Sequence, residues 1–173
     1  MMRLRPYKDC DAKYIAGWVT SEKTFYQWCA GKYEKYPVTA EEIIAAYAAQ
    51  AENDGFYEMT AVDETEVVGH LIMRFLDKEK KILRFGFVIV DDTKRGMGYG
   101  KKMLRLALKF AFEILCVDKV TIGVFENNPA AYHCYRSVGF CEAEPAETEL
   151  YPIMGEEWNC IYLETDCLPE MSE

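Results

Sequence analysis

The stretch that decides the fold reads Val88-Ile89-Val90-Asp91-Asp92-Thr93-Lys94-Arg95-Gly96-Met97-Gly98-Tyr99-Gly100-Lys101. An apolar run typical of a buried strand leads into three alternating glycines, and a long helical pattern follows them. Glycine lets backbone N–H groups approach a ligand closely and tolerates positive φ. A helix N-terminus adds unpaired N–H groups and partial positive charge, so this loop with Arg95 and Lys101 predicts a phosphate-binding site. The simpler interpretation is a glycine-rich turn that only begins a helix.

Two common phosphate-binding motifs do not fit this loop. A Walker loop needs G-x-x-x-x-G-K-[ST], whereas Lys101 is followed by Lys102 and the glycine spacing differs. The dinucleotide motif G-x-G-x-x-G needs a third glycine at position 101, which is lysine here. Glu126 closes the next strand, where a ribose-binding acid stands in dinucleotide-binding folds. The resemblance to an NAD site is therefore only partial.

Charge is distributed unevenly along the chain. The net charge is −9, and residues 141–173 contain ten acidic side chains without any Lys or Arg. Residues 94–112 show the reverse pattern, with six basic side chains and no acidic one. A nucleic-acid-binding protein needs a broad basic face, so this pattern argues against nucleic acid and for one anionic ligand at the basic segment. A solvated helix face is the alternative explanation for some of these lysines.

Length and composition limit the class of protein. The chain has 173 residues, of which 50% are hydrophobic and 14% aromatic, so we expect a single globular domain over residues 1–173. No apolar run approaches the roughly 20 residues needed to cross a bilayer, and the charged first 18 residues do not resemble a secretory signal. We therefore expect a cytoplasmic protein that does not associate with membranes. Seven cysteines without a C-x-x-C pair predict free thiols, and with two histidines we expect no metal site.

The periodicity of the apolar residues predicts an α/β fold (α+β, with a mixed sheet). Helices should cover both faces of this central sheet. Helical patterns cover the ranges 9–18, 21–30, 39–51, 98–115 and 129–138, and strand patterns cover 3–5, 57–62, 67–75, 82–90, 119–125, 140–142 and 158–164. Residues 77–81 fit a hairpin loop. The strand at 82–90 is nearly all apolar, which predicts a central position covered on both faces. The strand–helix–strand unit over 82–125 should be parallel and right-handed.

A second motif lies about 30 residues after the glycine loop. Asn128, Ala131, Tyr135, Gly139 and Phe140 follow the pattern N-x-x-A-x-x-x-Y-x-x-x-G-F. This pattern, together with a loop of the form R/Q-x-x-G-x-G/A, resembles the GNAT acetyltransferase superfamily over residues 82–142. The resemblance implies a GNAT-like fold, acetyl-CoA as co-substrate without a metal, and acetyl transfer to a primary amine in a ternary complex. It implies these cofactor-binding residues: Val88, Ile89, Val90, Arg95, Gly96, Met97, Gly98, Tyr99, Gly100, Lys101, Asn128 and Ala131.

The resemblance also implies a catalytic role for Tyr135 as the acid that protonates the departing thiolate. Tyr135 lies one helical turn after Ala131, so the two side chains share a face of their helix. A core tyrosine between helix and sheet is the alternative. The oxyanion donor should be a backbone N–H near residues 88–90, where the family's strand separates from its neighbour.

The general base is not assigned. Many members of the family carry Glu or Asp two residues ahead of the position of Gly86, where this chain has Arg84. Asp91 and Asp92 lie too near the glycine loop to assign, and Glu126 ends the next strand. Three acids of the C-terminal segment could also reach the acceptor site, namely Glu149, Glu156 and Glu157, and a chain of water molecules is equally compatible. Adjacent helical residues point about 100° apart, so His133 and Cys134 do not suggest a nucleophile–base pair.

The acceptor is open among small amines, aminoglycoside-like drugs, polyamines and protein amino groups. We expect no second domain that would recruit a protein, which favours a small-molecule amine. We expect some aromatic side chains around residues 25–28 to line the acceptor pocket, and a homodimer is common in such families. The rival interpretation is a non-catalytic acyl-CoA-binding or regulatory module, which the arginine at position 84 keeps open. Release of CoA in the presence of amines would distinguish the two.

Overall fold

The computed structural model describes residues 1–168, so Glu170 and Glu173 of the acidic C-terminal segment lie outside the described residues. The strands are β1 (Met2–Pro6), β2 (Phe56–Asp63), β3 (Glu66–Phe75), β4 (Ile82–Val90), β5 (Lys119–Phe125), β6 (Cys141–Glu142), β7 (Thr148–Ile153) and β8 (Glu156–Thr165). The helices are α1 (Ala12–Trp18), α2 (Glu22–Cys29), α3 (Ala40–Ala48), α4 (Tyr99–Lys109) and α5 (Pro129–Arg136). A π-helical turn, Phe110–Ile114, extends α4.

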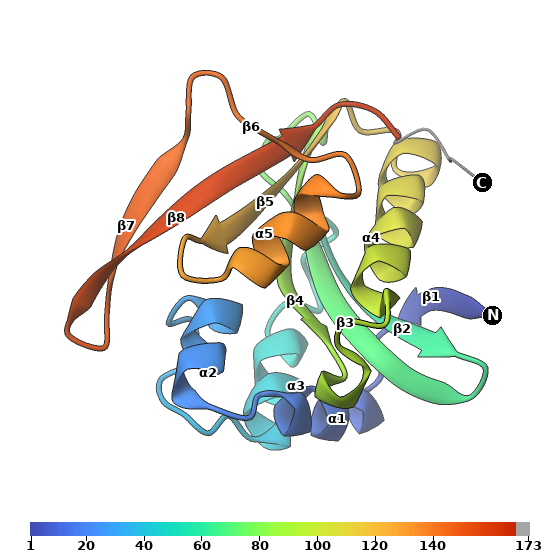
Figure 1. Ribbon diagram of the computed structural model, residues 1–173. Helices are drawn as coiled ribbons and strands as arrows, with labels where there is room; N and C mark the ends of the chain where they lie inside the picture. The colour runs from blue at the N-terminus through green and yellow to red at the C-terminus, as the bar shows by residue number, and fades with distance from the viewer. Residues whose placement is uncertain (169–173) are drawn as a thin grey trace.

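The strands form one mixed sheet in the order β1-β2-β3-β4-β5-β8-β6, and β7 pairs with β8 (Figure 1). Only β4 and β5 are parallel, as expected for the unit over 82–125, and the other pairs are antiparallel. Helices α4 and α5 pack on one face, around a core that includes Leu83, Phe85 and Leu104. Helices α1, α2 and α3 pack on the other face against Ile72 and Ile89. The predicted mixed sheet with helices on both faces is confirmed.

The helix starts follow local capping chemistry. Ser21 Oγ accepts a hydrogen bond from the Thr24 N–H, and Thr39 forms a capping box with Glu42. The Asn128 side chain accepts from the Ala131 N–H, with Pro129 at the first position of α5. These starts are the ones that the sequence predicts.

Strand β4 separates from β5 halfway along its length. The parallel pairing runs only from Ile82 opposite Lys119 to Phe85 opposite Ile122, while β5 continues to pair with β8 as far as Phe125. On its other side, β4 has a register shift against β3, and Phe87 adopts a positive φ of 46°. The backbone of β4 beyond Phe85 therefore has no ladder partner on the β5 side, and the separation expected near residues 88–90 is present.

Two expectations differ from the structure. The strand pattern predicts no strand between residues 142 and 158, whereas the structure has β7 there. Its acidic residues and Pro152 weaken the strand pattern, and pairing with β8 on only one side leaves most of β7 exposed. Strand β4 is central but is not uniformly covered on both faces. Leu83 and Phe85 are buried under α4, whereas Arg84 lies half-buried on the opposite face, beyond the area that α1–α3 cover.

Within residues 1–168, no helix has both the length and the apolar character needed to span a membrane. The same residues contain no group of three or more His, Cys, Asp or Glu side chains arranged to hold a metal ion. All seven cysteines are free.

Candidate active site

A cavity of about 610 Å³ opens where β4 separates from β5. Its walls come from the end of β4, the glycine loop, the first turn of α4, helix α5 and helix α2, elements that meet at the centre of Figure 1. Tyr135 lines the cavity. So do eleven of the twelve cofactor-binding residues predicted from the sequence: Val88, Ile89, Val90, Arg95, Gly96, Gly98, Tyr99, Gly100, Lys101, Asn128 and Ala131. The segments 88–101 and 128–135, about 40 residues apart in the chain, thus line the same cavity.

The glycine loop adopts the conformation that its composition favours. Gly96 and Gly98 have φ values of 75° and 82°, and Gly98 is the N-cap of α4. The first intrahelical bond runs from the Lys102 N–H to the Gly98 carbonyl. The N–H groups of the preceding helical residues, Tyr99 to Lys101, therefore have no partner within the helix. This arrangement provides backbone donors for an anion at the cavity wall.

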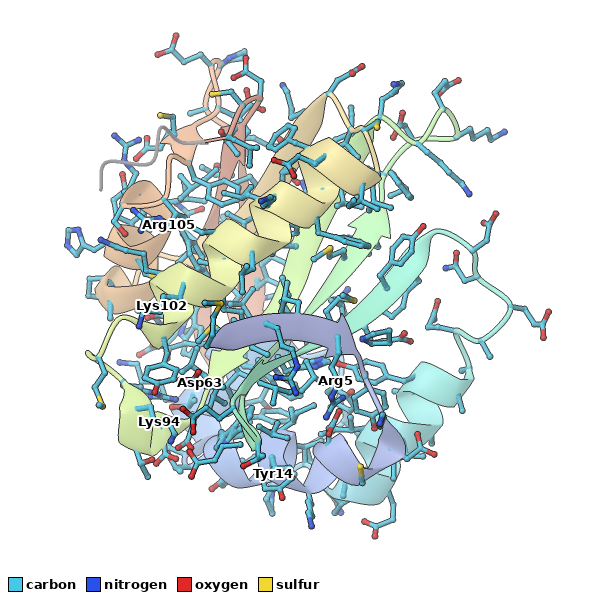
Figure 2. The ribbon with its side chains drawn as sticks, turned by 90° about the vertical axis from the view of Figure 1, so that its right-hand side faces the viewer. Arg5, Tyr14, Asp63, Lys94, Lys102 and Arg105 are labelled. Carbon is cyan, nitrogen blue, oxygen red and sulfur yellow. The ribbon has the colours of Figure 1, made fainter. Side chains whose placement is uncertain are left out.

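Met97 is the predicted cofactor residue that does not line the cavity. Its side chain is 62% exposed and its N–H donates to the Lys94 carbonyl, because the short turn before the loop turns this residue outward. Lys94 is held by Glu66 at 2.6 Å, and the Tyr99 hydroxyl donates to Asp63 at 3.1 Å. Figure 2 labels Lys94 and Asp63. These two contacts tie the glycine loop and the start of α4 to β2 and β3.

Tyr135 lies on α5 and is 7% exposed, with its ring against Phe140. Burial raises its pKa above the ordinary value, so the hydroxyl is protonated at neutral pH. It makes no hydrogen bond to any group within residues 1–168, which leaves a phenol donor available at the cavity wall. Cys134, beside it, has its pKa raised by burial and is therefore a thiol rather than a reactive thiolate.

Helix α2 contributes cavity residues that the motifs do not contain. Thr24, Gln27 and Trp28 line the cavity, and the Gln27 amide donates to the Asn127 carbonyl at 3.1 Å. This contact joins α2 to the loop before α5 across about 100 residues of sequence, which no local pattern reveals. Of the aromatic residues expected around 25–28, Trp28 reaches the cavity, whereas Phe25 is completely buried in the core.

Arg84 lies on the sheet face opposite α4. Its Nε donates to Thr121 Oγ1 at 2.9 Å, and its guanidinium lies 4.2 Å from the centroid of the Tyr162 ring. Glu147 lies 3.9 Å from Arg84 Nη2. A positive charge thus stands on the strand position where the resemblance implies a carboxylate.

The acids that the sequence leaves open as bases mostly have local partners. Glu149 Oε2 accepts from the hydroxyls of Tyr162 and Tyr151 at 2.8 and 3.0 Å, and these bonds hold its pKa below its usual range. Glu126 accepts from Asn159, Glu156 from Trp158, and Asp91 from the N–H and hydroxyl of Thr93.

The chain matches the model of the acetyltransferase (GNAT) family over residues 16–140. Its relatives include the SPbeta prophage-derived uncharacterized N-acetyltransferase YokL of Bacillus subtilis, with 26% identity over 61% of this chain and 59% of that protein. The spermidine N(1)-acetyltransferase of Vibrio cholerae is 33% identical over 32% of each chain. The L-amino acid N-acetyltransferase AaaT of Escherichia coli is 26% identical over 52% of this chain and 56% of that protein. These alignments therefore span between about a third and three fifths of the relatives' length.

Solved structures show the same fold. The spermidine N-acetyltransferase of Vibrio cholerae in complex with CoA and spermine superposes with a TM-score of 0.80 over 95% of this chain and 94% of that chain, at 19% identity. A chimera of that enzyme and hSSAT superposes with a TM-score of 0.77. At this level of identity the likeness concerns the fold.

Proposed function

The chain belongs to the GNAT acetyltransferase family, and from this premise we propose that it transfers the acetyl group of acetyl-CoA to a primary amine by direct attack in a ternary complex. The observation that carries the proposal is the single cavity shared by the glycine loop, the unpaired end of β4 and Tyr135. We also propose that residues 1–173 form one domain and that the acceptor is a small molecule, as it is for the relatives named for spermidine and L-amino acids.

The cavity suits a long anionic cofactor. The N–H groups of Tyr99, Gly100 and Lys101, with the side chains of Arg95 and Lys101, would hold the pyrophosphate. A Cβ built on Gly98 would have no atom within 4 Å, so space for a ligand adjoins the loop. The free backbone groups of β4 beyond Phe85 would hydrogen-bond the amide-bearing arm of the cofactor in place of a neighbouring strand.

The reaction needs three proton or charge adjustments. An amine with a pKa near 10.4 is neutral in only about one molecule in a few thousand at pH 7, so it must lose a proton before attack. Its nitrogen then attacks the thioester carbonyl carbon, and a backbone N–H near Val88–Val90 would stabilise the oxyanion. As the C–S bond breaks, the Tyr135 hydroxyl would give its proton to the thiolate. Because Arg84 stands where a carboxylate is usual, the amine proton must leave to a different acid or to a chain of water molecules.

The first test is a thermal unfolding assay with acetyl-CoA, using NAD and ATP as controls. A ligand at one hundred times its Kd stabilises the folded state by about 2.7 kcal/mol, which raises Tm by roughly 5–10 °C for a domain of this size. We expect that rise with acetyl-CoA alone. A rise with NAD instead would overturn the assignment of the loop. CoA release with a panel of amines then separates a catalyst from a module that only binds the cofactor.

A further inference from the structure

Two arginines lie directly opposite each other on neighbouring strands. Arg74 of β3 pairs with Arg84 of β4 in the antiparallel register, which places their Cβ atoms about 4.5–5.5 Å apart on one face. Their sequence neighbours Met73, Leu83 and Phe85 point to the other face and pack under α4. Like charges directly opposite each other destabilise a sheet. Arg84 already has Glu147 at 3.9 Å from its Nη2, so among the described residues Arg74 is the member of the pair that lacks a carboxylate partner.

The two guanidinium groups differ in how they are held. Arg84 is oriented by its hydrogen bond to Thr121 and by the ring of Tyr162. Within residues 1–168, the side chain of Arg74 forms no hydrogen bond or ion pair. Burial and the charge of Arg84 lower its pKa, but an arginine stays charged at any physiological pH. Arg74 therefore offers unused donors beside a guanidinium that is already fixed.

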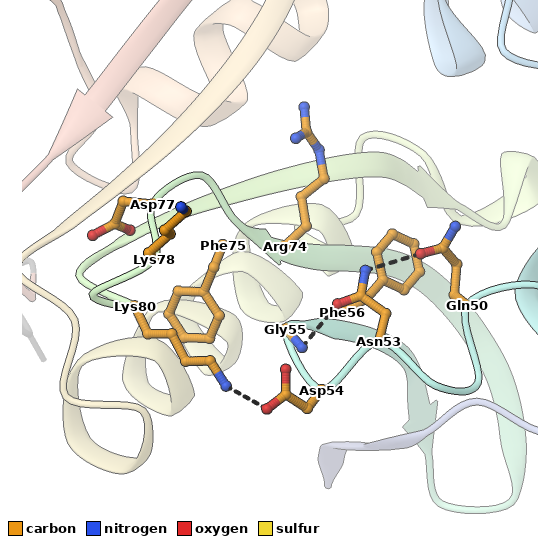
Figure 3. A pocket seen from close by; sticks show the side chains of 10 residues that line it. All are labelled: Gln50, Asn53, Asp54, Gly55, Phe56, Arg74, Phe75, Asp77, Lys78 and Lys80. Carbon is orange, nitrogen blue, oxygen red and sulfur yellow. Dashed lines mark hydrogen bonds and ion pairs between the residues drawn. The ribbon is translucent and has the colours of Figure 1, made fainter.

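Within residues 1–168, no acid forms an ion pair with Arg74, neither Glu58, which lies diagonally from it on β2, nor the acids of the neighbouring turns. Figure 3 shows Arg74 extending away from Asp54 and Lys80, which pair with each other at 2.8 Å. Asp77 accepts from the backbone N–H groups of Lys81 and Ile82. The arginine points out of this satisfied group and along the open sheet face.

The arginine pair lies beside the reaction centre of the proposed function, on which this inference rests. Arg84 precedes Gly86 by two residues, which is about 7 Å along a strand, and β4 leaves β5 after Phe85. In the proposed reaction the acceptor would reach this opening from the sheet face that carries Arg84, the face on which α2 also lines the cavity. Glu149, held ionised by Tyr151 and Tyr162, lies farther along the same face, level with the end of β5.

We propose that Arg74 and Arg84 bind a carboxylate of the acceptor, so that the acceptor is a carboxylate-bearing amine of the amino-acid class. Arginine forks match the geometry of a carboxylate and bind it through charge-assisted hydrogen bonds. A polyamine carries only positive charges, and two arginines beside the opening would repel it. The substrate class therefore differs from the spermidine and spermine named for the structural neighbours.

The test compares acceptors that differ only in the carboxylate: tyrosine with tyramine, methionine with 3-(methylthio)propylamine, lysine with cadaverine, and spermidine as a further amine. We expect kcat/KM, measured by the release of CoA, to be at least tenfold higher for the amino acid of each pair than for its decarboxylated amine. Arg74→Gln should lower kcat/KM for the acid by on the order of ten- to a hundredfold and leave its decarboxylated partner within about twofold. Arg3→Gln, an exposed arginine on β1, is the matched control and should change neither. A preference of the wild type for the decarboxylated amines or for spermidine overturns the proposal. So does an equal loss of kcat/KM by Arg74→Gln on both members of a pair.

Calorimetry on the CoA-loaded protein separates this proposal from the proposed function. Binding of the acid, weakened by Arg74→Gln, without any acetylation would support the carboxylate site and contradict the transferase activity. Acetylation of the amines without any preference for the carboxylate-bearing member of a pair would support the transferase activity and contradict the carboxylate site.

Discussion

At the scale of single residues, Tyr135 combines properties that separate a proton donor from a core tyrosine. It is buried and its pKa is raised, yet its hydroxyl has no partner within residues 1–168 and adjoins the cavity. Tyr7 and Tyr33 in the core also have hydroxyls without a partner in this part of the chain, so the position at the cavity is what distinguishes Tyr135 from them. We predict that Tyr135→Phe lowers kcat tenfold or more, because the thiolate then leaves without a proton, while the Kd for acetyl-CoA changes less than about twofold.

The matched control for this prediction is Tyr132→Phe. Tyr132 lies on the same helix, but its hydroxyl donates to Glu142 at 2.6 Å and it does not line the cavity. Steady-state kinetics should show an unchanged kcat for this variant. An equal loss of kcat in both variants would mean that the loss comes from the helix and not from the phenol.

Asp11 is the second residue whose environment predicts a measurable effect. Its buried carboxylate accepts from Arg5 at 2.7 and 2.8 Å, from the Lys8 N–H and from Thr60. Burial raises the pKa of this carboxyl, but those hydrogen bonds outweigh burial and hold the pKa below its usual range. Removing one partner of a buried pair costs about 3–5 kcal/mol, so we predict that Asp11→Asn lowers the free energy of unfolding by about that amount at pH 7.

The pH dependence of the Asp11 effect has a definite sign. A carboxylate whose pKa is depressed by folding contributes stability above its unfolded pKa of about 3.9, and this stability is lost as the pH falls through the folded value. Urea unfolding at several pH values should therefore show a constant gap between the wild type and Asp11→Asn from pH 8 to 5. The gap should shrink below about pH 4. A gap that narrows between pH 7 and 5 would contradict this account.

The placement of residues around the cavity was predictable from sequence only where a local motif carries it. The glycine loop and Tyr135 each sit in a short run whose spacing determines the geometry. The Arg5–Asp11–Thr60 cluster joins side chains 49 residues apart, and the pairing of Arg74 with Arg84 depends on the strand register. No spacing rule reports such contacts, because the tertiary fold creates them.

At the scale of elements, the glycine loop depends on backbone conformations that side chains disfavour. Gly98 begins α4 with a φ of 82° and lines the cavity. We predict that Gly98→Ala lowers the free energy of unfolding by about 1–2 kcal/mol, since a Cβ disfavours this region. The added methyl group would also enter the space next to the loop, so the Kd for acetyl-CoA should rise about tenfold.

Gly155→Ala separates the two effects of that substitution. Gly155 has a φ of 76° and also has no atom within 4 Å of a built Cβ, but it lies in the β7–β8 turn away from the cofactor cavity. Denaturation should show a similar loss of stability, and calorimetry should show an unchanged Kd for acetyl-CoA. If both variants weaken cofactor binding equally, the loop has no special role.

Element boundaries were predictable where a period and a cap coincide. Helices α3 and α5 begin at the residues that Thr39 and Asn128 indicate. Strand β7 was missed because it is mostly exposed and contains Pro152, so it lacks an apolar period. The point where β4 leaves β5 has no signal of its own in the strand pattern and came only from the family resemblance, since the pairing is a long-range property.

At the scale of the whole molecule, one buried histidine links the N-terminal helices to the sheet. His70 lies completely buried on β3, and its Nε2 is 2.6 Å from the hydroxyl of Tyr47 on α3. Burial lowers the pKa of His70 to about 3, whereas an unfolded histidine titrates near 6.5. The folded state therefore keeps His70 neutral over a pH range in which the unfolded state binds a proton.

This difference predicts how the stability of the whole fold responds to acid. Because the folded pKa of His70 lies below the unfolded one, its contribution is complete above about pH 6.5 and declines as the pH falls. We predict that this single proton lowers the free energy of unfolding by about 1.4 kcal/mol per pH unit between pH 6 and 4. Urea unfolding of the wild type and of His70→Gln checks it, since the variant should lose that part of the slope. His133→Gln should keep the full slope, because His133 is exposed. Equal slopes for wild type and His70→Gln would show that other groups control acid unfolding, and that the contact between α3 and β3 does not depend on a neutral imidazole.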